Sequence, residues 1–199
     1  MIGDFEIHRD GDACQRGEQE FIWGLIKAIK PETVVETGTH KGLTSIYIAR
    51  GLEDNAKGHL WTVDPFDWQQ EETFDGLSPN LKKYITYQRM RGDELKVDSK
   101  IDFLFIDGYH GKDDVIQEMD NLFPMLNERA LVLFHDCLEI EENWHQGVLQ
   151  ALTEKGILDK TITIPSLNWM RLYEYNSSHG DQQKRSSKVS KRTTKKANL

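Results

Sequence analysis

The stretch TVVETGTHKGLTS, residues 33–45, decides the fold that this sequence predicts. A short β-branched apolar run breaks at Glu36, and the chain then passes through Gly38 and Gly42 before a helical pattern begins. This order is typical of a strand, a tight loop and a helix N-terminus. Glycine permits a positive φ and a close ligand approach, and the free N–H groups of a helix N-terminus favour an anionic or carboxylate-bearing ligand. We therefore expect a small polar metabolite to bind at this loop.

Other glycine-loop patterns do not match this stretch. A Walker phosphate loop needs Lys and then Ser or Thr after its last glycine, whereas Gly42 is followed by Leu43. A dinucleotide fingerprint, G-x-G-x-x-G, lacks its first glycine in residues 37–42, TGTHKG, which disfavours an oxidoreductase. What remains is E-x-G-x-x-x-G at the end of a strand. Its structural alternative is an ordinary turn whose glycines serve geometry alone.

Length and composition limit the class of protein. With 199 residues, the chain is long enough for one well-packed domain and leaves little for a second. No apolar run approaches the roughly 18 residues of a membrane span, and residues 1–12 do not resemble a signal peptide. We therefore expect a soluble, cytoplasmic protein without a membrane partner. Cys14 and Cys137 have no neighbours at metal-ligand or redox-motif spacing, so we expect free thiols.

The charge is unevenly distributed along the chain. Residues 176–199 hold seven Lys or Arg and one acidic residue, so this segment carries +6 and the remainder −14, against a net charge of −8. The last segment is rich in polar residues and nearly free of large apolar ones, which predicts a disordered basic tail. The acidic body argues against a broad nucleic-acid-binding face.

Helical and strand patterns alternate along the chain. One helical stripe, formed by Ile22, Leu25, Ile26 and Ile29, ends before Pro31; others run from Leu43 to near Gly51 and through Val115, Met119, Leu122 and Leu126. Strand-like runs lie at residues 33–36, 59–63, 84–88, 101–106, 130–134, 161–164 and 168–175. Residues 18–175 are therefore expected to form one α/β domain, a Rossmann-like three-layer αβα sandwich with a seven-stranded, mostly parallel sheet and an antiparallel last strand. Residues 1–17 should form an arm over the ligand or a contact in a homo-oligomer, and residues 176–199 the tail.

Acidic residues and histidines follow several strands. Asp64 ends the second strand, where a carboxylate suits a ribose, although it also suits a turn before Pro65. Asp93 follows the third strand and is a candidate for an adenine amino group or a helix N-cap. The fourth strand ends in DGYH, residues 107–110, and the fifth in HD, residues 135–136. Because ligands in open α/β sheets bind at the carboxyl ends of strands, we expect these side chains to converge on one crevice.

The glycine loop, the D-G-x-H motif and the H-D motif together resemble the class I S-adenosylmethionine (SAM)-dependent methyltransferases. The resemblance covers roughly residues 18–175 and is strongest to the small-molecule O-methyltransferase branch, which includes catechol and macrolide-sugar O-methyltransferases. It implies that SAM is bound through Glu36, Gly38, Gly42, Thr44, Asp64, Asp93 and Asp107. In this scheme Glu36 and the two glycines hold the methionine part and Thr44 reaches its carboxylate, while Asp64 binds the ribose and Asp93 the adenine.

Relatives in this branch often bind a divalent cation, which implies a Mg²⁺ site at Asp107 and Asp136. This chain departs from the pattern at Cys137, where relatives commonly place Asn or Asp, and a thiol is a poor Mg²⁺ ligand. The catalytic candidates are His110, as a base near neutral pH, and Asp107. A second reading of His110 is that it holds Asp107 or a metal-bound water, and His135 is expected to orient Asp136.

The implied function is methyl transfer to a small hydroxylated acceptor such as a sugar or a phenol. Methyl transfer from a sulfonium is an in-line displacement, to which alignment of the acceptor contributes much of the rate. Two alternatives are a non-catalytic cofactor-binding protein and a nucleic-acid methyltransferase tethered by the basic tail. The second is disfavoured by the acidic body and by the lack of an N-P-P-Tyr-type motif.

Overall fold

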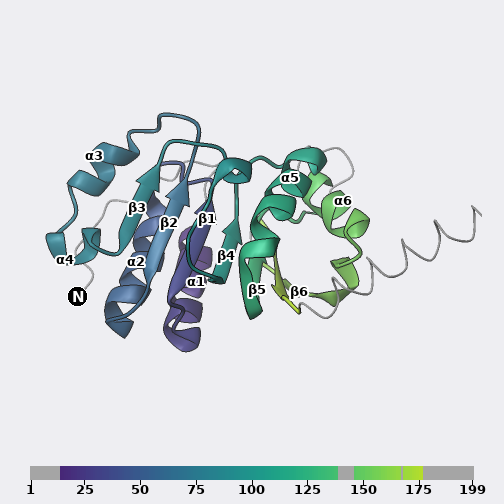
Figure 1. Cartoon of the computed structure of the whole chain (residues 1–199), viewed down its shortest axis with the longest axis horizontal. Coiled ribbons are helices and arrows are strands. Elements are labelled where there is room, and N and C mark those ends of the chain that lie inside the picture. Colours follow the sequence, from purple (N-terminus) through teal and green to yellow (C-terminus); the bar gives the residue numbers. More distant parts are fainter. Residues whose placement is uncertain (1–13, 139–145, 167, 177–199) are drawn as a thin grey trace, which may run out of the picture.

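The predicted strands form one sheet in the computed structural model, which describes residues 14–138, 146–166 and 168–176 (Figure 1). The order of the seven strands is β3-β2-β1-β4-β5-β7-β6, and neighbours are parallel except that β7 runs antiparallel to β5 and β6. This confirms the mostly parallel sheet with an antiparallel last strand. The strands are β1 (Thr33–Thr37), β2 (His59–Val63), β3 (Ile85–Gln88), β4 (Ile101–Ile106), β5 (Leu126–Phe134), β6 (Thr161–Ile164) and β7 (Met170–Glu174).

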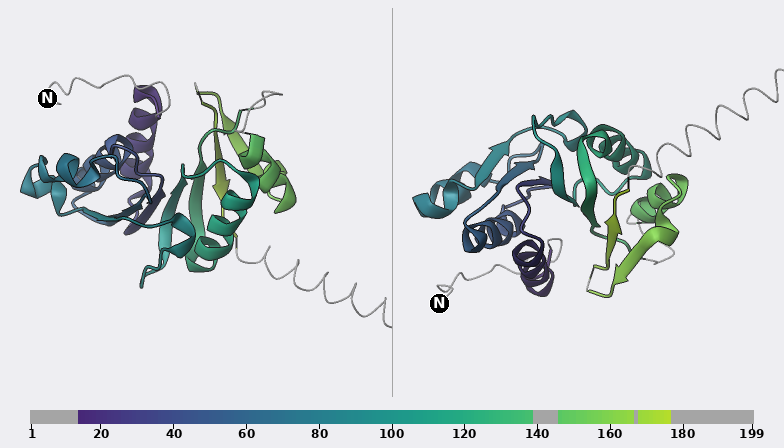
Figure 2. Two further views of the ribbon diagram at one scale, coloured as in Figure 1. Left: turned by 90° about the horizontal axis from the view of Figure 1, so that it is seen from above. Right: turned by 60° about the horizontal axis from the view of Figure 1, so that its bottom comes forward.

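Helices cover both faces of the sheet and complete the three layers (Figure 2). On one face α1 (Arg16–Ile29) packs against α2 (Leu43–Asn55), and on the other α5 (Lys112–Leu122) packs against α6 (Gln146–Glu154). None of the helices that the structure describes is both long and apolar enough to cross a membrane. Shorter helices and 3-10 turns lie in the connections: α3 (Gln70–Asp75), α4 (Pro79–Lys82), η1 (Gly92–Glu94), η2 (Phe123–Met125) and η3 (Leu158–Lys160).

Successive residues of the central strands enter different hydrophobic cores. In β1, Val34 packs with the side chains of α1 and α2, whereas Val35 packs with those of α5 and α6. In β4, Phe105 joins the first core and Leu104 the second, and both are fully buried. Side chains alternate across a strand, so a strand buried on both faces reads as a continuous apolar run. This is why the strands could be recognised in the sequence.

The first helix begins inside the segment predicted as an arm. α1 starts at Arg16 rather than after residue 17, because the Glu18 carboxylate accepts a hydrogen bond from the Gln15 N–H at 2.7 Å and so caps the first turn. Lys30, with a φ of 53°, ends the helix before Pro31, as predicted. Residues 1–13 of the predicted arm and 177–199 of the predicted tail lie outside the described residues.

Two predicted helix ends are wrong. α2 continues past Gly51 to Asn55. Gly51 does not stop the helix. It allows α1 and α2 to pack closely, since a Cβ there would be 2.6 Å from Cγ2 of Ile26. α5 ends at Leu122 rather than Leu126, because Pro124 forms the turn η2 and cannot donate to a helix. Leu126 instead begins β5 and pairs with Ile101.

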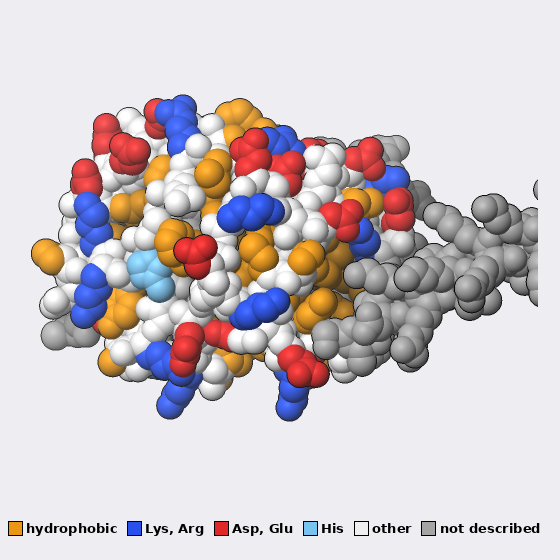
Figure 3. Space-filling view, viewed as in Figure 1, with side chains coloured by type: hydrophobic (Ala, Val, Ile, Leu, Met, Phe, Trp, Pro, Cys, Tyr) orange, Lys and Arg blue, Asp and Glu red, His pale blue; other side chains and the backbone are white. Residues whose placement is uncertain are grey.

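Charged side chains of both signs are interspersed on the face shown in Figure 3. Lys and Arg lie beside Asp and Glu and are separated by apolar side chains, so the described part of this face carries no continuous basic stripe. Phosphate backbones are bound by such stripes. The folded body thus gives no support on this face to nucleic-acid binding.

Candidate functional site

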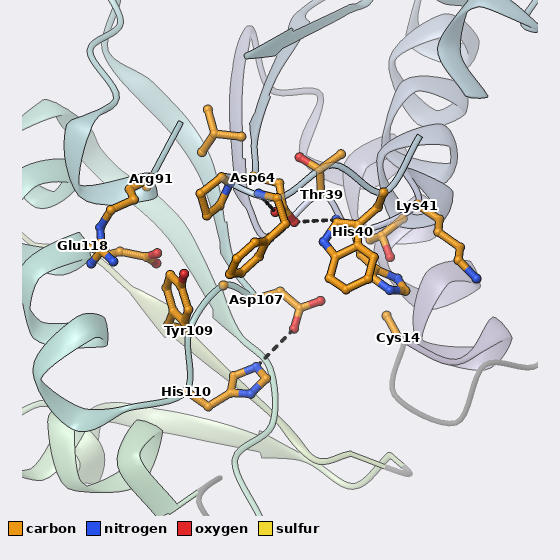
Figure 4. Close-up of a pocket in the computed structure, with 18 of the residues that line it drawn as sticks. Cys14, Thr39, His40, Lys41, Asp64, Arg91, Asp107, Tyr109, His110 and Glu118 are labelled. Carbon is orange, nitrogen blue, oxygen red and sulfur yellow. Dashed lines mark hydrogen bonds and ion pairs between the residues drawn. The ribbon is translucent and has the colours of Figure 1, made fainter. Parts of the chain in front are cut away.

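A cavity of about 370 Å³ lies at the carboxyl ends of the central strands. Cys14 and Lys41 lie at one end of it and Arg91 and Glu118 at the other, with Asp107 between them (Figure 4). This is the position predicted from the strand-end residues. Of the residues predicted to bind a cofactor, four line the cavity and three do not; those that line it are Gly38, Thr44, Asp64 and Asp107, and the others are Glu36, Gly42 and Asp93.

The glycine loop is held tightly between neighbouring strands. Gly38 has a φ of +85°, and a Cβ at this position would lie 1.9 Å from the carbonyl oxygen of Asp107. The N–H of Gly38 donates to the carbonyl of Val63 at 2.9 Å, so the loop is fixed to β2 as well as to β4. Gly42 has a φ of +81° and is the N-cap residue of α2, and a Cβ there would lie 2.8 Å from the Phe74 ring. Both glycines are therefore required by the backbone, independently of any ligand.

Asp64 organises the loop that faces the cavity. Its carboxylate accepts hydrogen bonds from the backbone N–H of His40 at 2.8 Å and from that of Phe66 at 2.9 Å. The side chain is buried and lines the cavity. Asp64 can therefore hold the turn and still bind a ligand in the cavity, because a carboxylate that accepts two hydrogen bonds retains lone pairs for a further donor.

Glu36 lies beneath the loop. It is fully buried and accepts hydrogen bonds from the hydroxyls of Ser45 and Thr62, which join β1 to α2 and β2. Its other oxygen, Oε1, has no hydrogen-bond partner among the described residues. Burial raises the pKa of Glu36 to about 8, against the opposing effect of the two hydroxyl donors. At neutral pH this carboxyl group is therefore mostly uncharged.

Asp93 is engaged outside the cavity. Its carboxylate accepts a hydrogen bond at 2.8 Å from Nε of Arg91, whose guanidinium also reaches Asp114 at 3.2 Å and lies 5.1 Å from the centre of the Tyr109 ring. Arg91 and Tyr109 line the cavity, and Asp93 is not among the described residues that do.

Glu118 is a cavity residue that the sequence reasoning missed. It is 3% exposed and accepts a hydrogen bond from the Thr37 hydroxyl at 2.8 Å. Burial raises the pKa of Glu118 to about 7, although the Thr37 hydroxyl opposes this. The available signal was its position in α5, next to Met119 and three residues after Val115 on the buried stripe. An acidic residue on an apolar helix face is a candidate for a site.

The strand-end histidines and carboxylates meet in one cluster. His110 Nε2 lies 2.9 Å from Oδ2 of Asp136 and 3.9 Å from Oδ1 of Asp107. His135 Nδ1 lies 2.8 Å from the same Asp107 oxygen and 3.2 Å from Asp136. On its other side, Nε2 of His135 lies 3.2 Å from the Glu18 carboxylate. His135 therefore contacts Asp107 and Glu18 as well as Asp136, the partner expected from the sequence.

This cluster shifts the ionisation of its members. Burial alone would lower the pKa of His110, but the nearby carboxylates outweigh burial and raise it to about 9. The pKa of His135 is likewise raised, because Asp107 and Asp136 outweigh its burial. Conversely, burial would raise the pKa of Asp136, and the two histidines hold it well below its usual range. The carboxylates around them therefore favour the protonated form of both histidines.

Asp107, His110 and Asp136 each offer a ligand atom, and these atoms lie within 4.8 Å of one another. The two carboxylates are suited to Mg²⁺, although both already contact histidines. Cys137 adds no ligand of that kind. It is fully buried, its thiol faces the carbonyls of Phe134 and His135, and burial raises its pKa to about 12.

Aromatic side chains surround the opening of the cavity. Phe66 and Trp68 are 49% and 41% exposed although both line it. The Trp68 ring lies 4.9 Å from that of His40, and the Phe66 ring 6.0 Å from that of Tyr109, measured between centroids. Trp68 lies in the connection between β2 and α3. These rings give the opening an apolar, flat-sided character.

Comparison with solved structures shows the fold. An O-methyltransferase from Bacillus cereus in complex with S-adenosylhomocysteine (SAH) matches with a TM-score of 0.68 and 13% identity, over 82% of this chain and 83% of that one. The O-methyltransferase TomG from Streptomyces achromogenes, involved in tomaymycin synthesis and in complex with SAM, matches with a TM-score of 0.67 and 16% identity, over 85% and 86%.

Sequence comparison identifies the family. A curated relative, the uncharacterized protein y4gI of Sinorhizobium fredii, is 29% identical over 161 residues, which are 72% of this chain and 17% of that protein. The chain thus spans about a sixth of the length of this relative. A family model described as a methyltransferase domain matches residues 35–137, just over half of the chain, from β1 to the end of the H-D motif. The chain therefore belongs to this methyltransferase-domain family.

Proposed function

We propose that this protein is a SAM-dependent methyltransferase that methylates an oxygen of a small hydroxylated acceptor, of sugar or phenol type. The observation that carries the proposal is the cavity itself. It brings Gly38 of the loop after β1, Asp64 after β2 and Asp107 after β4 together at the carboxyl edge of the sheet. Two solved O-methyltransferases of this fold are in complex with SAM or SAH, which supports the same ligand here.

The cavity residues fit the parts of SAM. Asp64, with lone pairs left after its two backbone bonds, is proposed to accept from the ribose hydroxyls. Thr44 and the N-terminus of α2 would receive the carboxylate of the amino-acid part, because a helix N-terminus favours negative charge. The adenine would lie toward Arg91, Tyr109 and Glu118. Glu36 and Gly42 would then support the loop, and Asp93 would act through Arg91.

Bound SAM supplies a methyl group activated by its positively charged sulfur. The S–CH₃ bond breaks as the acceptor oxygen forms a new O–CH₃ bond, SAH is released, and the hydroxyl proton must pass to a base. Asp107 borders the cavity and is proposed to orient the acceptor hydroxyl and accept its proton. His110 contacts both Asp107 and Asp136, which supports a role in holding these carboxylates; acting as the base would require it first to release its proton.

A Mg²⁺ ion at Asp107 and Asp136 is a finer proposal on the same site. It is supported by three ligand atoms that lie within 4.8 Å of one another. The ion would have to displace the histidine contacts of 2.9 Å and 2.8 Å that these carboxylates now make. Bound there, Mg²⁺ would favour the ionised form of an acceptor hydroxyl.

Calorimetric titration of SAH into the full chain, with and without Mg²⁺, tests the binding half of the proposal. We expect micromolar affinity that Asp64→Ala abolishes, while Asp98→Ala, at a residue outside the described cavity lining, leaves it unchanged. A lack of SAH binding under both conditions would overturn the proposal. Tighter binding of a catechol or sugar acceptor with Mg²⁺, lost in Asp136→Asn, would support the metal site.

Catalysis is tested separately from binding. Incubation with SAM and a panel of phenols and sugars should give a product heavier by one methyl group in place of a hydrogen, detected by mass spectrometry. Asp107→Asn should remove this product. Tight SAH binding without transfer to any member of a broad panel would favour the non-catalytic reading.

A further inference from the structure

Gln19 is a cavity-lining residue that carries a buried hydrogen-bond acceptor without a partner in the described part of the chain. It is the fourth residue of α1, is 1% exposed and lines the cavity. Its side-chain Oε1 has no hydrogen-bond partner among the residues that the structure describes. A buried polar atom without a partner destabilises the folded state, so such atoms in a protein call for an explanation.

The orientation of this amide is fixed by its neighbour. The Nε2 of Gln19 donates to the backbone carbonyl of Cys14 at 2.8 Å. Rotating the amide by 180° would place its oxygen against that carbonyl oxygen, and two acceptors repel each other. The Cys14 contact therefore holds the Gln19 nitrogen and leaves the oxygen available for a donor.

Gln19 marks one end of the cavity. Its partner Cys14 lies near Lys41, opposite Arg91 and Glu118 (Figure 4). α2 begins two residues after Lys41, and its first residues Leu43 and Thr44 also line the cavity. This end thus offers a helix N-terminus, which suits the carboxylate of an amino acid.

An amino acid also carries an ammonium group, which requires acceptors. The resemblance assigned this part of SAM to Glu36, but the Glu36 carboxyl faces Ser45 and Thr62 and is not among the described residues lining the cavity. Among the described residues, Gln19 Oε1 and Glu36 Oε1 are both buried polar atoms without a partner. Of these two, Gln19 is the one that borders the cavity.

We propose that Gln19 Oε1 accepts a hydrogen bond from the ammonium group of the amino-acid part of SAM, in place of the contact expected from Glu36. This inference rests on the proposed SAM binding. Gln19 would select ligands that carry an ammonium group at this end, because its acceptor is satisfied by them and left unpaired by others. It is a binding residue and takes no part in the transfer of the methyl group.

Three ligands separate this contact from the rest of the site. SAH carries both the ammonium and the carboxylate, its deaminated analogue lacks the ammonium group, and 5′-methylthioadenosine lacks both. Their dissociation constants would be measured by calorimetry for the full-length wild-type chain and for Gln19→Met. This substitution keeps the length of the side chain and removes both the acceptor and the donor to the Cys14 carbonyl. Gln19→Met should weaken SAH binding by roughly tenfold to a hundredfold, the range of one hydrogen bond to a charged group. It should leave the other two ligands within about twofold of wild type.

A comparison within the wild-type chain guards against a folding defect in Gln19→Met. If Gln19 Oε1 accepts from the ammonium group, the wild-type chain should bind SAH at least about tenfold more tightly than its deaminated analogue. Equal wild-type affinity for these two ligands, or equal weakening of all three ligands in Gln19→Met, would overturn the inference. Unchanged SAH affinity in Gln19→Met would do the same. If the wild-type chain binds 5′-methylthioadenosine and SAH but one of these contrary results is obtained, only the proposed Gln19 contact is wrong. If the wild-type chain binds none of the three ligands, the proposed SAM-dependent function is wrong as well.

Discussion

At the scale of single residues, the most unusual feature is an acidic side chain sealed beneath the glycine loop. Glu36 is fully buried, and its pKa is raised to about 8 from the ordinary 4.5. As pH rises from 4.5, the unfolded chain releases this proton before the folded chain does. The unfolded state is therefore increasingly favoured up to about pH 8, and the free energy of unfolding should fall across this window.

Glu36→Gln removes this titration and retains an oxygen for the Ser45 and Thr62 donors. Relative to wild type, we expect the variant to gain roughly 3–5 kcal/mol in free energy of unfolding between pH 4.5 and pH 8. Urea unfolding at several pH values measures this difference. Glu71→Gln, the same change at an exposed position, should stay within about 0.5 kcal/mol of wild type. A Glu36→Gln difference that does not vary with pH would show that Glu36 keeps an ordinary pKa.

Gly38→Ala tests the contact between the loop and β4. The new Cβ would lie 1.9 Å from the Asp107 carbonyl oxygen at a φ of +85°, so the loop must move. We expect a loss of roughly 2–4 kcal/mol in stability and a loss of SAH binding. Gly17→Ala is the matched control, because a Cβ there has no described atom within 4 Å. Normal SAH affinity in Gly38→Ala would contradict a loop fixed by this contact.

The site residues that could be predicted from the sequence are those that follow a strand. Asp64, Asp107 and His110 follow strands directly, and parallel strands bring their carboxyl ends to one edge. Gln19 and Glu118 reach the same cavity from helices, and their approach depends on how those helices pack. For Glu118 the sequence carries only an indirect signal, an acidic residue on the apolar face of its helix, which does not say which cavity the side chain reaches.

At the scale of elements, β1 and β4 were predicted more closely than the ends of α2 and α5, whereas β5 begins at Leu126, four residues before its predicted start. β1 and β4 are buried on both faces and so read as unbroken apolar runs, which fixed their positions to within a residue or two. Helix ends depended on single residues whose role differs by context. Gly51 is a site of close helix packing within α2, and Pro124 stops α5 before its apolar periodicity ends.

Two glycine substitutions separate these contexts. Gly24 lies within α1 with no described atom within 4 Å of an added Cβ, so Gly24→Ala should stabilise the protein by about 0.5–1 kcal/mol through helix propensity alone. Gly51→Ala gains the same propensity, but its Cβ would lie 2.6 Å from Ile26 Cγ2 and must force α1 and α2 apart. We expect a net loss of about 1–3 kcal/mol in thermal or urea unfolding. Stabilisation by both substitutions would show that the helix contact tolerates a methyl group.

At the scale of the whole molecule, Glu18 connects segments that are distant in the chain. Its carboxylate accepts from the N–H of Gln15 in the helix cap and from that of Asn168 before β7, and it contacts His135 after β5. Burial would raise the pKa of Glu18, but His135 outweighs burial and lowers it to about 2. Through His135, the first helix is thereby tied to Asp107 in the cavity.

This connection predicts energetic coupling between α1 and the ends of the central strands. Glu18→Gln should cost about 1–3 kcal/mol at pH 7, because it leaves a protonated, buried His135 with fewer carboxylate partners. With His135→Gln added, the total cost should be smaller than the sum of the single costs by about 1–3 kcal/mol, since both changes break the same contact. The exposed Arg16–Glu20 pair of the same helix provides the control, and Glu20→Gln should cost no more than about 0.5 kcal/mol. If the two single costs in free energy of unfolding, measured with urea, add strictly in the double variant, the Glu18–His135 contact does not couple α1 to the strand ends.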